Sequence, residues 1–160
     1  MFLGAHFALP AISVIGYEYL VSEKKSELPK VKLSSLAIIG LVGLIPDMFY
    51  PHLGGGSHLH SNSHSVWAMF LFMGAITLLY YALSVKKETK FLIFLLFSLV
   101  SHYILDFFSG GIKWLYPFSE QVIGIRLIPF GAYVLADFVS LSMFFILVFF
   151  IKRTHYEKAI

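Results

Sequence analysis

The sequence contains no cysteine, and charged residues make up only 13% of its 160 residues. The absence of cysteine excludes disulfides and thiolate metal sites, so only histidine and carboxylate side chains remain to hold a metal such as zinc or a similar divalent ion. The low charge accompanies 58% hydrophobic residues. This composition is typical of an integral membrane protein and not of a soluble domain. We expect one membrane domain over residues 1–160.

Apolar stretches long enough to cross a bilayer recur along the chain. Five spans are predicted, at about residues 2–21, 33–50, 66–85, 91–108 and 132–151. The first span has no basic segment before it and no small-residue cleavage site after it, which favours a retained helix over a signal peptide. The predicted fold class is therefore all-α, an integral membrane bundle of about five transmembrane helices.

Basic residues are unevenly distributed among the segments that join these spans. Residues 22–32 contain four lysines, residues 86–90 contain three, and the tail adds Lys152, Arg153 and Lys158, so ten of the twelve basic residues fall on one side of an alternating topology. The positive-inside rule assigns that side to the cytoplasm. We therefore expect a multi-pass inner-membrane protein with an extracytoplasmic N-terminus and a cytoplasmic C-terminus. Membrane topology explains the net charge of +3, so no nucleic-acid partner is inferred.

Histidines gather at the extracytoplasmic end of this topology. Six of the seven fall there, four of them in one His-rich loop: His6, His52, His58, His60, His64 and His102. His102 and Asp106 lie one helical turn apart, so a helix would present both to one metal ion. Asp47 ends the second span at the same depth. A carboxylate within a span costs about 2.5–3.5 kcal/mol and needs a partner or a cavity, so the cluster favours a metal site over isolated hydrogen bonds.

Three further polar residues are candidates for binding a substrate. Lys113 and Arg126 are the only basic residues expected outside, which suits an anionic group such as phosphate. Contact with lipid headgroups is the alternative for both. Asp137 shares a helical face with Tyr133 and Ser140 inside the fifth span. It could contact substrate, support a metal ligand or form a hydrogen bond that pairs two helices.

The order of these motifs resembles the family of LexA-regulated inner-membrane metal-dependent hydrolases. The resemblance covers nearly the whole chain and rests on His6, Pro46-Asp47, His60-Ser-Asn-Ser-His64-Ser65, His102-x-x-x-Asp106, Gly110-Gly111 and Leu115-Tyr116-Pro117-Phe118. That family usually has His-Arg-Gly-x-Thr-His-Ser where this chain has residues 60–65, and the arginine is missing here. Any substrate role of that arginine either falls to Arg126 or is absent from this chain.

The ligand order is also similar, more distantly, to the zinc-dependent phospholipase C and P1 nuclease group, an all-helical fold with clustered zinc ions. This likeness implies one zinc ion held by four side chains: Asp47, His64, His102 and Asp106. It also implies that Asp106 bridges to a second ion bound by His6, with His58 or His60 completing the second site. The later histidines of that group have no counterpart in this sequence.

Together these features predict a membrane-bound metal-dependent hydrolase with one or two divalent ions, zinc being the expected metal. Asp106 and Asp47 are the candidate catalytic residues, Asp47 either as a ligand or as the base for the attacking water. A site at headgroup depth suits membrane lipid or another small amphiphilic phosphoester, while carboxylic-ester and amide chemistry stay open. The alternative is a non-enzymatic protein that binds or transports metal. Transport is disfavoured because the polar residues gather on one side of the membrane.

Overall fold

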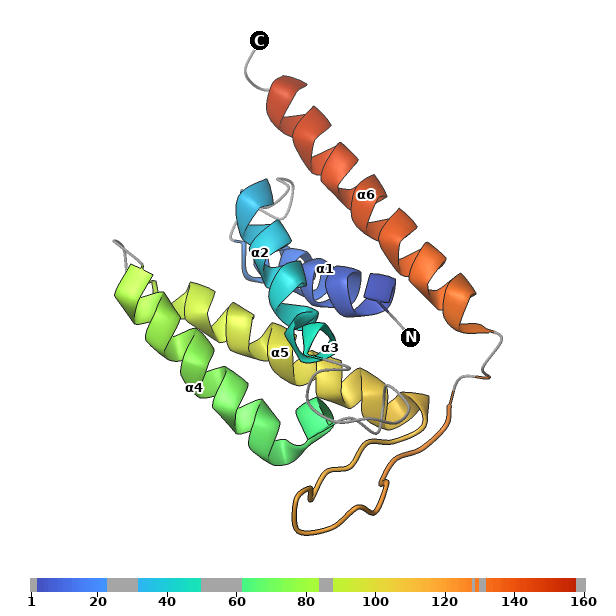
Figure 1. Ribbon diagram of the computed structural model, residues 1–160. Helices are drawn as coiled ribbons and strands as arrows, with labels where there is room; N and C mark the ends of the chain where they lie inside the picture. Colours follow the sequence, from blue (N-terminus) through green and yellow to red (C-terminus); the bar gives the residue numbers. More distant parts are fainter. Residues whose placement is uncertain are drawn as a thin grey trace.

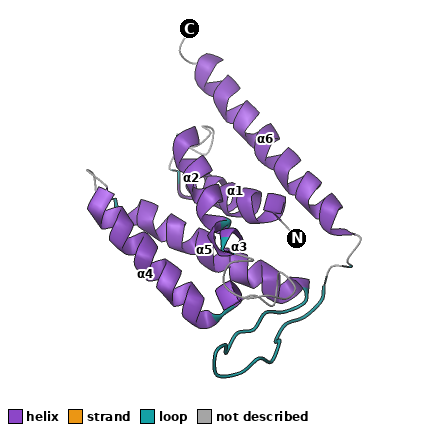
Figure 2. Cartoon of the chain, viewed as in Figure 1, coloured by secondary structure: helices purple, strands orange, loops and turns teal. Residues whose placement is uncertain are grey.

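The computed structural model describes residues 3–22, 32–49, 62–83, 88–127, 129 and 132–157. Within those ranges most residues are helical, and the ribbon contains no strand (Figure 2). The described extended pairing is a single antiparallel bridge between Ile112 and Ile123. The predicted all-α fold class is confirmed.

Helices α1 and α5 lie at the centre of the assembly (Figure 1). The elements in chain order are α1 (Leu3–Val21), α2 (Leu33–Gly43), α3 (Ile45–Met48), the 3-10 turn η2 (Asn62–His64), α4 (Val66–Leu83), α5 (Thr89–Ser109) and α6 (Tyr133–Glu157). Helix α1 packs against α2, α5 and α6, and α5 also packs against α2 and α4. The beginning of the chain is thus held by segments that come much later in the sequence.

The described part of the chain has three helices long and apolar enough to cross a membrane, at Val66–Leu83, Thr89–Ser109 and Tyr133–Arg153. The described residues therefore supply fewer such helices than the expected five. The first expected span, α1, carries His6, Pro10 and Glu18, which lower its hydropathy. The second breaks at Leu44 into the 11-residue α2 and the 4-residue α3. At 1.5 Å per residue, α2 is about 16 Å long, roughly half of a 30 Å hydrocarbon core.

Small residues allow α1 and α2 to approach closely. A β-carbon added at Gly40 would lie 2.6 Å from the ring of Phe7, and one added at Gly43 would collide with the backbone oxygen of His6. Ala8 is buried in the same core. Membrane helices commonly use small residues in this way, because backbones can then pack without intervening side chains. The close approach places His6 beside the end of α2.

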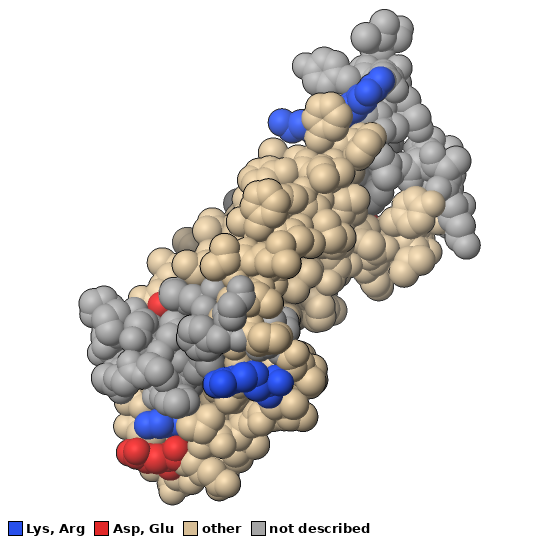
Figure 3. All heavy atoms as spheres, turned by 90° about the vertical axis from the view of Figure 1, so that its right-hand side faces the viewer, with Lys and Arg blue, Asp and Glu red and all other residues tan. Residues whose placement is uncertain are grey.

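The outer surfaces of the long helices are apolar. Leu71 and Leu78 of α4 and Val134 of α6 each expose more than 70% of their surface. On the face drawn in Figure 3, the described lysine and arginine atoms lie toward the two ends of the molecule, and the stretch between them is tan apart from one small red area at its edge. An apolar surface between charged ends is the arrangement expected of a protein whose middle faces the acyl chains of a bilayer and whose ends face headgroups and water.

Candidate metal centre

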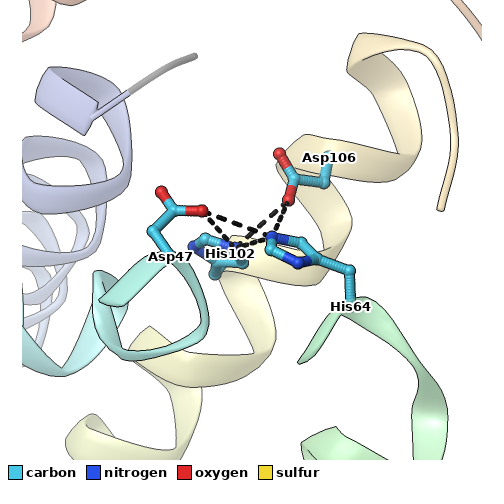
Figure 4. Close-up of side chains that lie close together, drawn as sticks. All are labelled: Asp47, His64, His102 and Asp106. Carbon is cyan, nitrogen blue, oxygen red and sulfur yellow. Dashed lines mark hydrogen bonds and ion pairs between the residues drawn. The ribbon is translucent and has the colours of Figure 1, made fainter. Parts of the chain in front are cut away.

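Four side chains with metal-binding atoms meet near the end of α5. They are Asp47 from α3, His64 from η2, and His102 and Asp106 from α5 (Figure 4). One ligand atom from each lies within 4.8 Å of the other three. All four residues are buried, and even the most exposed, Asp47, exposes only 6% of its surface. The structure therefore brings together the four residues that were expected to share one ion.

Local sequence explains how the first two side chains are placed. Pro46 lies in the first turn of α3, where proline is tolerated because the amide there needs no helical partner. This short helix carries Asp47 into the interior. Ser65 follows His64 directly and caps α4, because its hydroxyl oxygen accepts a 3.2 Å hydrogen bond from the amide of Ala68. The start of α4 therefore fixes the position from which His64 projects.

The distances among the four groups fit one small divalent ion. The Nε2 atoms of His64 and His102 lie 3.1 Å apart, and each lies 3.1 Å from Oδ2 of Asp106. Oδ1 of Asp47 lies 3.3 Å from His64 Nε2 and 3.6 Å from His102 Nε2. A tetrahedron of ligands with bonds of about 2.0–2.1 Å has edges of about 3.3–3.4 Å. Two imidazoles and two carboxylates at this spacing are a donor set that zinc accepts.

A backbone contact fixes the orientation of His102. Its Nδ1 donates a 2.7 Å hydrogen bond to the carbonyl oxygen of Gly43, since a carbonyl can only accept. In the neutral imidazole this leaves the lone pair on Nε2, the nitrogen that faces His64 and Asp106. Histidines that bind metals are commonly held in this way, with the second ring nitrogen donating to a carbonyl.

His6 lies beside this group. Its Nε2 is 3.2 Å from Oδ1 of Asp106, the carboxylate oxygen opposite the one nearest His64 and His102. The His6 ring also stacks on His102, with ring centroids 4.0 Å apart. The two oxygens of Asp106 thus have different neighbours. His6 is therefore joined to the other side chains through the carboxylate of Asp106 and through the ring of His102.

His64 lies just before α4, close to the carboxylates of Asp47 and Asp106. Burial disfavours its positive charge, but hydrogen bonds to Asp106 and Asp47 and the negative charges of both outweigh burial and raise the pKa of His64 to about 9. Without a metal, His64 is therefore protonated at neutral pH and offsets part of the carboxylate charge. A cation that binds here must displace that proton.

The other predicted site residues have different neighbours. Lys113 pairs with a glutamate of its own segment, its Nζ lying 3.5 Å from the carboxylate, and Arg126 is exposed. Asp137 accepts a 2.9 Å hydrogen bond from the amide of Ala5. This contact joins α6 to the first turn of α1, which is the helix-pairing role among the three considered. His60 lies outside the described residues.

Two residues outside the predicted set support the centre. Gly43 supplies the carbonyl that holds His102, and Tyr103 donates from its hydroxyl to the backbone oxygen of Ser63 over 2.8 Å. The second bond fastens η2, and with it His64, to α5. A glycine shortly before Pro-Asp and a tyrosine directly after the histidine were the available sequence signals. Neither residue type by itself indicates a metal site.

Residues 1–158 match the model of the YdjM inner membrane protein family. The chain belongs to that family. Membership in the YdjM family confirms the predicted inner-membrane location, although the family description names no reaction. Neither the curated proteins nor the solved structures contain a match to the chain, so the likeness to zinc-dependent phospholipase C and P1 nuclease gains no support.

Proposed function

We propose that this member of the YdjM family is a membrane-bound metal-dependent hydrolase. The observation that carries the proposal is the 3.1–3.6 Å spacing of two imidazole nitrogens and two carboxylate oxygens from Asp47, His64, His102 and Asp106. When bound there, a divalent ion such as zinc supplies Lewis acidity, which polarises the scissile group and makes water a stronger nucleophile at neutral pH.

The distances suggest separate roles for these side chains. His64, His102 and Asp106 form the tighter set, with three equal edges of 3.1 Å, and we assign them as the ligands. Asp47 lies farther from both histidines. Catalytic zinc sites commonly use three protein ligands and leave a fourth position open. A carboxylate beside that position is placed to accept a proton from the attacking water, which is the role we assign to Asp47.

The position of the centre along α5 favours an amphiphilic substrate. Asp106 lies three residues before the end of the Thr89–Ser109 span, about 5 Å along the helix axis. Groups at that depth lie near the headgroups of a bilayer. We therefore propose a phosphoester of a lipid or of another amphiphile as the substrate, with the centre on the extracytoplasmic side. The lysine-rich segments at the other ends of the spans support that orientation.

Elemental analysis and a hydrolysis assay on the same purified protein test the proposal. We expect about one zinc-sized ion per chain, or two if His6 and Asp106 hold another, and hydrolysis of phospholipid in mixed micelles. His102→Ala and Asp106→Asn should each lose both metal and hydrolysis. Asp137→Asn, a change on a neighbouring helix, should keep both. Full metal content and full activity in the first two variants would exclude the centre.

A non-enzymatic metal-binding role is the second candidate, and one observation favours it. All four side chains are buried, and four protein ligands around one ion are typical of closed, structural zinc sites. In that case purified protein would retain its metal through a wide substrate screen without hydrolysing any phosphoester, ester or amide. Loss of metal would then lower thermal stability and nothing else.

A further inference from the structure

The segment between α5 and α6 forms a two-limbed arm, residues 112–127, that projects from the bundle (Figure 1). Its limbs are joined by the Ile112–Ile123 bridge, whose two backbone hydrogen bonds measure 3.1 and 3.0 Å. The arm begins directly after the helix that carries His102 and Asp106. It therefore lies at the same end of the molecule as the candidate metal centre.

Both limbs of the arm are fastened to the ends of membrane-spanning helices. The Trp114 carbonyl accepts a 3.0 Å hydrogen bond from the amide of Val66, the first residue of α4. On the returning limb, the amide of Ile125 donates a 2.8 Å hydrogen bond to the backbone carbonyl oxygen of Phe107. The amide of Leu127 donates a 3.0 Å hydrogen bond to that of Phe108. These contacts hold the arm at the level where two spans end.

The arm exposes apolar side chains in series. Phe118 exposes 81% of its surface, Leu127 63%, Ile125 51% and Leu115 49%. Trp114, by contrast, packs inward against Tyr103 and Phe107, with ring centroids 6.4 and 6.3 Å apart. The exposed apolar surface of the arm is thus formed by the neighbours of Trp114 and not by Trp114 itself. Exposure of several large apolar groups on one short segment indicates a surface that has a partner.

A contact with α4 fixes the depth of this surface. The ring of Phe118 lies 5.9 Å from that of Trp67, measured between centroids. Trp67 is the second residue of the Val66–Leu83 span and is half exposed. Tryptophan at the end of a span lies at the boundary between headgroups and acyl chains, so Phe118 lies at that boundary too. The outer face of α4 therefore meets the exposed side of the arm at these two rings.

We propose that the arm is an interfacial anchor, whose partner is the lipid bilayer of the leaflet next to the metal centre. Phe118, Leu115 and Leu127 enter the acyl boundary, while exposed Arg126 reaches lipid phosphates. The irregular backbone of the arm keeps it from the hydrocarbon core, where unpaired amides and carbonyls are not tolerated. The proposal rests on the membrane location of the family and does not require hydrolysis.

Single-site spin labelling tests the anchor, because the chain has no cysteine of its own. Phe118→Cys, Leu127→Cys and Glu120→Cys variants, each spin-labelled, are placed in bilayers of phosphatidylethanolamine and phosphatidylglycerol. Collisions with oxygen report lipid, and collisions with a water-soluble nickel chelate report water. We expect the oxygen-to-nickel ratio at positions 118 and 127 to be several-fold higher than at position 120, where the glutamate is 79% exposed. Leu71→Cys on the outer face of α4 gives the value for full lipid exposure.

Two outcomes would overturn the anchor. Labels at positions 118 and 127 that collide mainly with nickel place the arm in water. Labels that are immobilised and shielded from both reagents place it against another protein or a second copy of the chain. Since these side chains are exposed, the substitutions leave the packed interior unchanged, and a helical circular dichroism spectrum confirms the fold before each measurement.

Discussion

His102 donates from Nδ1 to the carbonyl oxygen of Gly43 over 2.7 Å, which ties a candidate ligand on α5 to the last residue of α2. Gly43 also lies against the backbone oxygen of His6. A residue without a side chain thus contacts both His102 of the centre and His6 beside it. The geometry of the centre depends on this close approach as well as on the ligands themselves.

Gly43→Ala should disturb the centre without removing a ligand. The new β-carbon would collide with the His6 backbone and lie 3.0 Å from Oγ of Ser98, so the end of α2 must move and weaken the bond to His102. Loss of such a supporting bond typically lowers metal affinity by about 10–100-fold, which competition with a chelator measures. Gly74→Ala is the matched control, because nothing lies within 4 Å of its added carbon. Equal affinities in the two variants would contradict this reading.

Asp47→Asn and His64→Ala should separate the base from a ligand. If Asp47 accepts the proton of water, the asparagine variant keeps its metal and loses about 10²–10⁴ in kcat. His64→Ala removes one corner of the triangle, and with it two of the three 3.1 Å edges, and should lose the metal itself. Metal content and kcat are measured on the same preparations. Metal loss in both variants would instead assign Asp47 as a fourth ligand.

Asp137→Ala should destabilise the protein and leave the metal bound. The carboxylate accepts the Ala5 amide, one of the first-turn donors of α1 that have no partner within the helix. Removing such a cap costs about 1 kcal/mol, or roughly 2–4 °C in Tm for a chain of this size. Asp137→Asn keeps an acceptor oxygen and should recover most of the loss. A large fall in activity with unchanged Tm would instead favour substrate contact.

Metal binding should depend on pH through His64. Its pKa of about 9 in the metal-free centre means that a proton leaves when a cation binds at neutral pH. Apparent metal affinity is therefore expected to rise with pH and to level off near pH 9, as titration calorimetry in buffers of different ionisation enthalpy would show.

The stability of the metal-free protein should instead fall as pH rises. The raised pKa stabilises the fold fully below about 6.5, and this contribution is lost as pH rises through 9. A metal affinity that does not change with pH would contradict the assignment of a proton to His64 in the metal-free centre.

The sequence predicted the composition of the centre better than the number of spans. The His102-x-x-x-Asp106 spacing follows from helix geometry alone, because residues four apart share a face. The prediction that Asp47 and His64 lie near this pair came from the topology, which places the polar ends of the spans at one depth. The structure brings all four residues together. His6 also lies at the same centre, through Asp106.

Other features depended on tertiary contacts that local sequence does not specify. The break at Leu44 separates α2 from α3 within an apolar run that reads as one span. The partner of Asp137 is an amide near the start of the chain, 132 residues away, so no helical periodicity could identify it. Trp114 points inward while its neighbours are exposed, because its ring packs against Tyr103.

The packing of α1 against α5 and α6 has a consequence for the order of biogenesis. Helix α1 leaves the ribosome well before its partners α5 and α6 have been made. His6 therefore has no Asp106 to contact until α5 has been synthesised, and Ala5 has no Asp137 until α6 has entered the membrane. Completion of the centre is therefore a late event in assembly. A truncated chain that ends before α6 would insert its earlier spans, but the Ala5 amide at the start of α1 would lack its Asp137 acceptor.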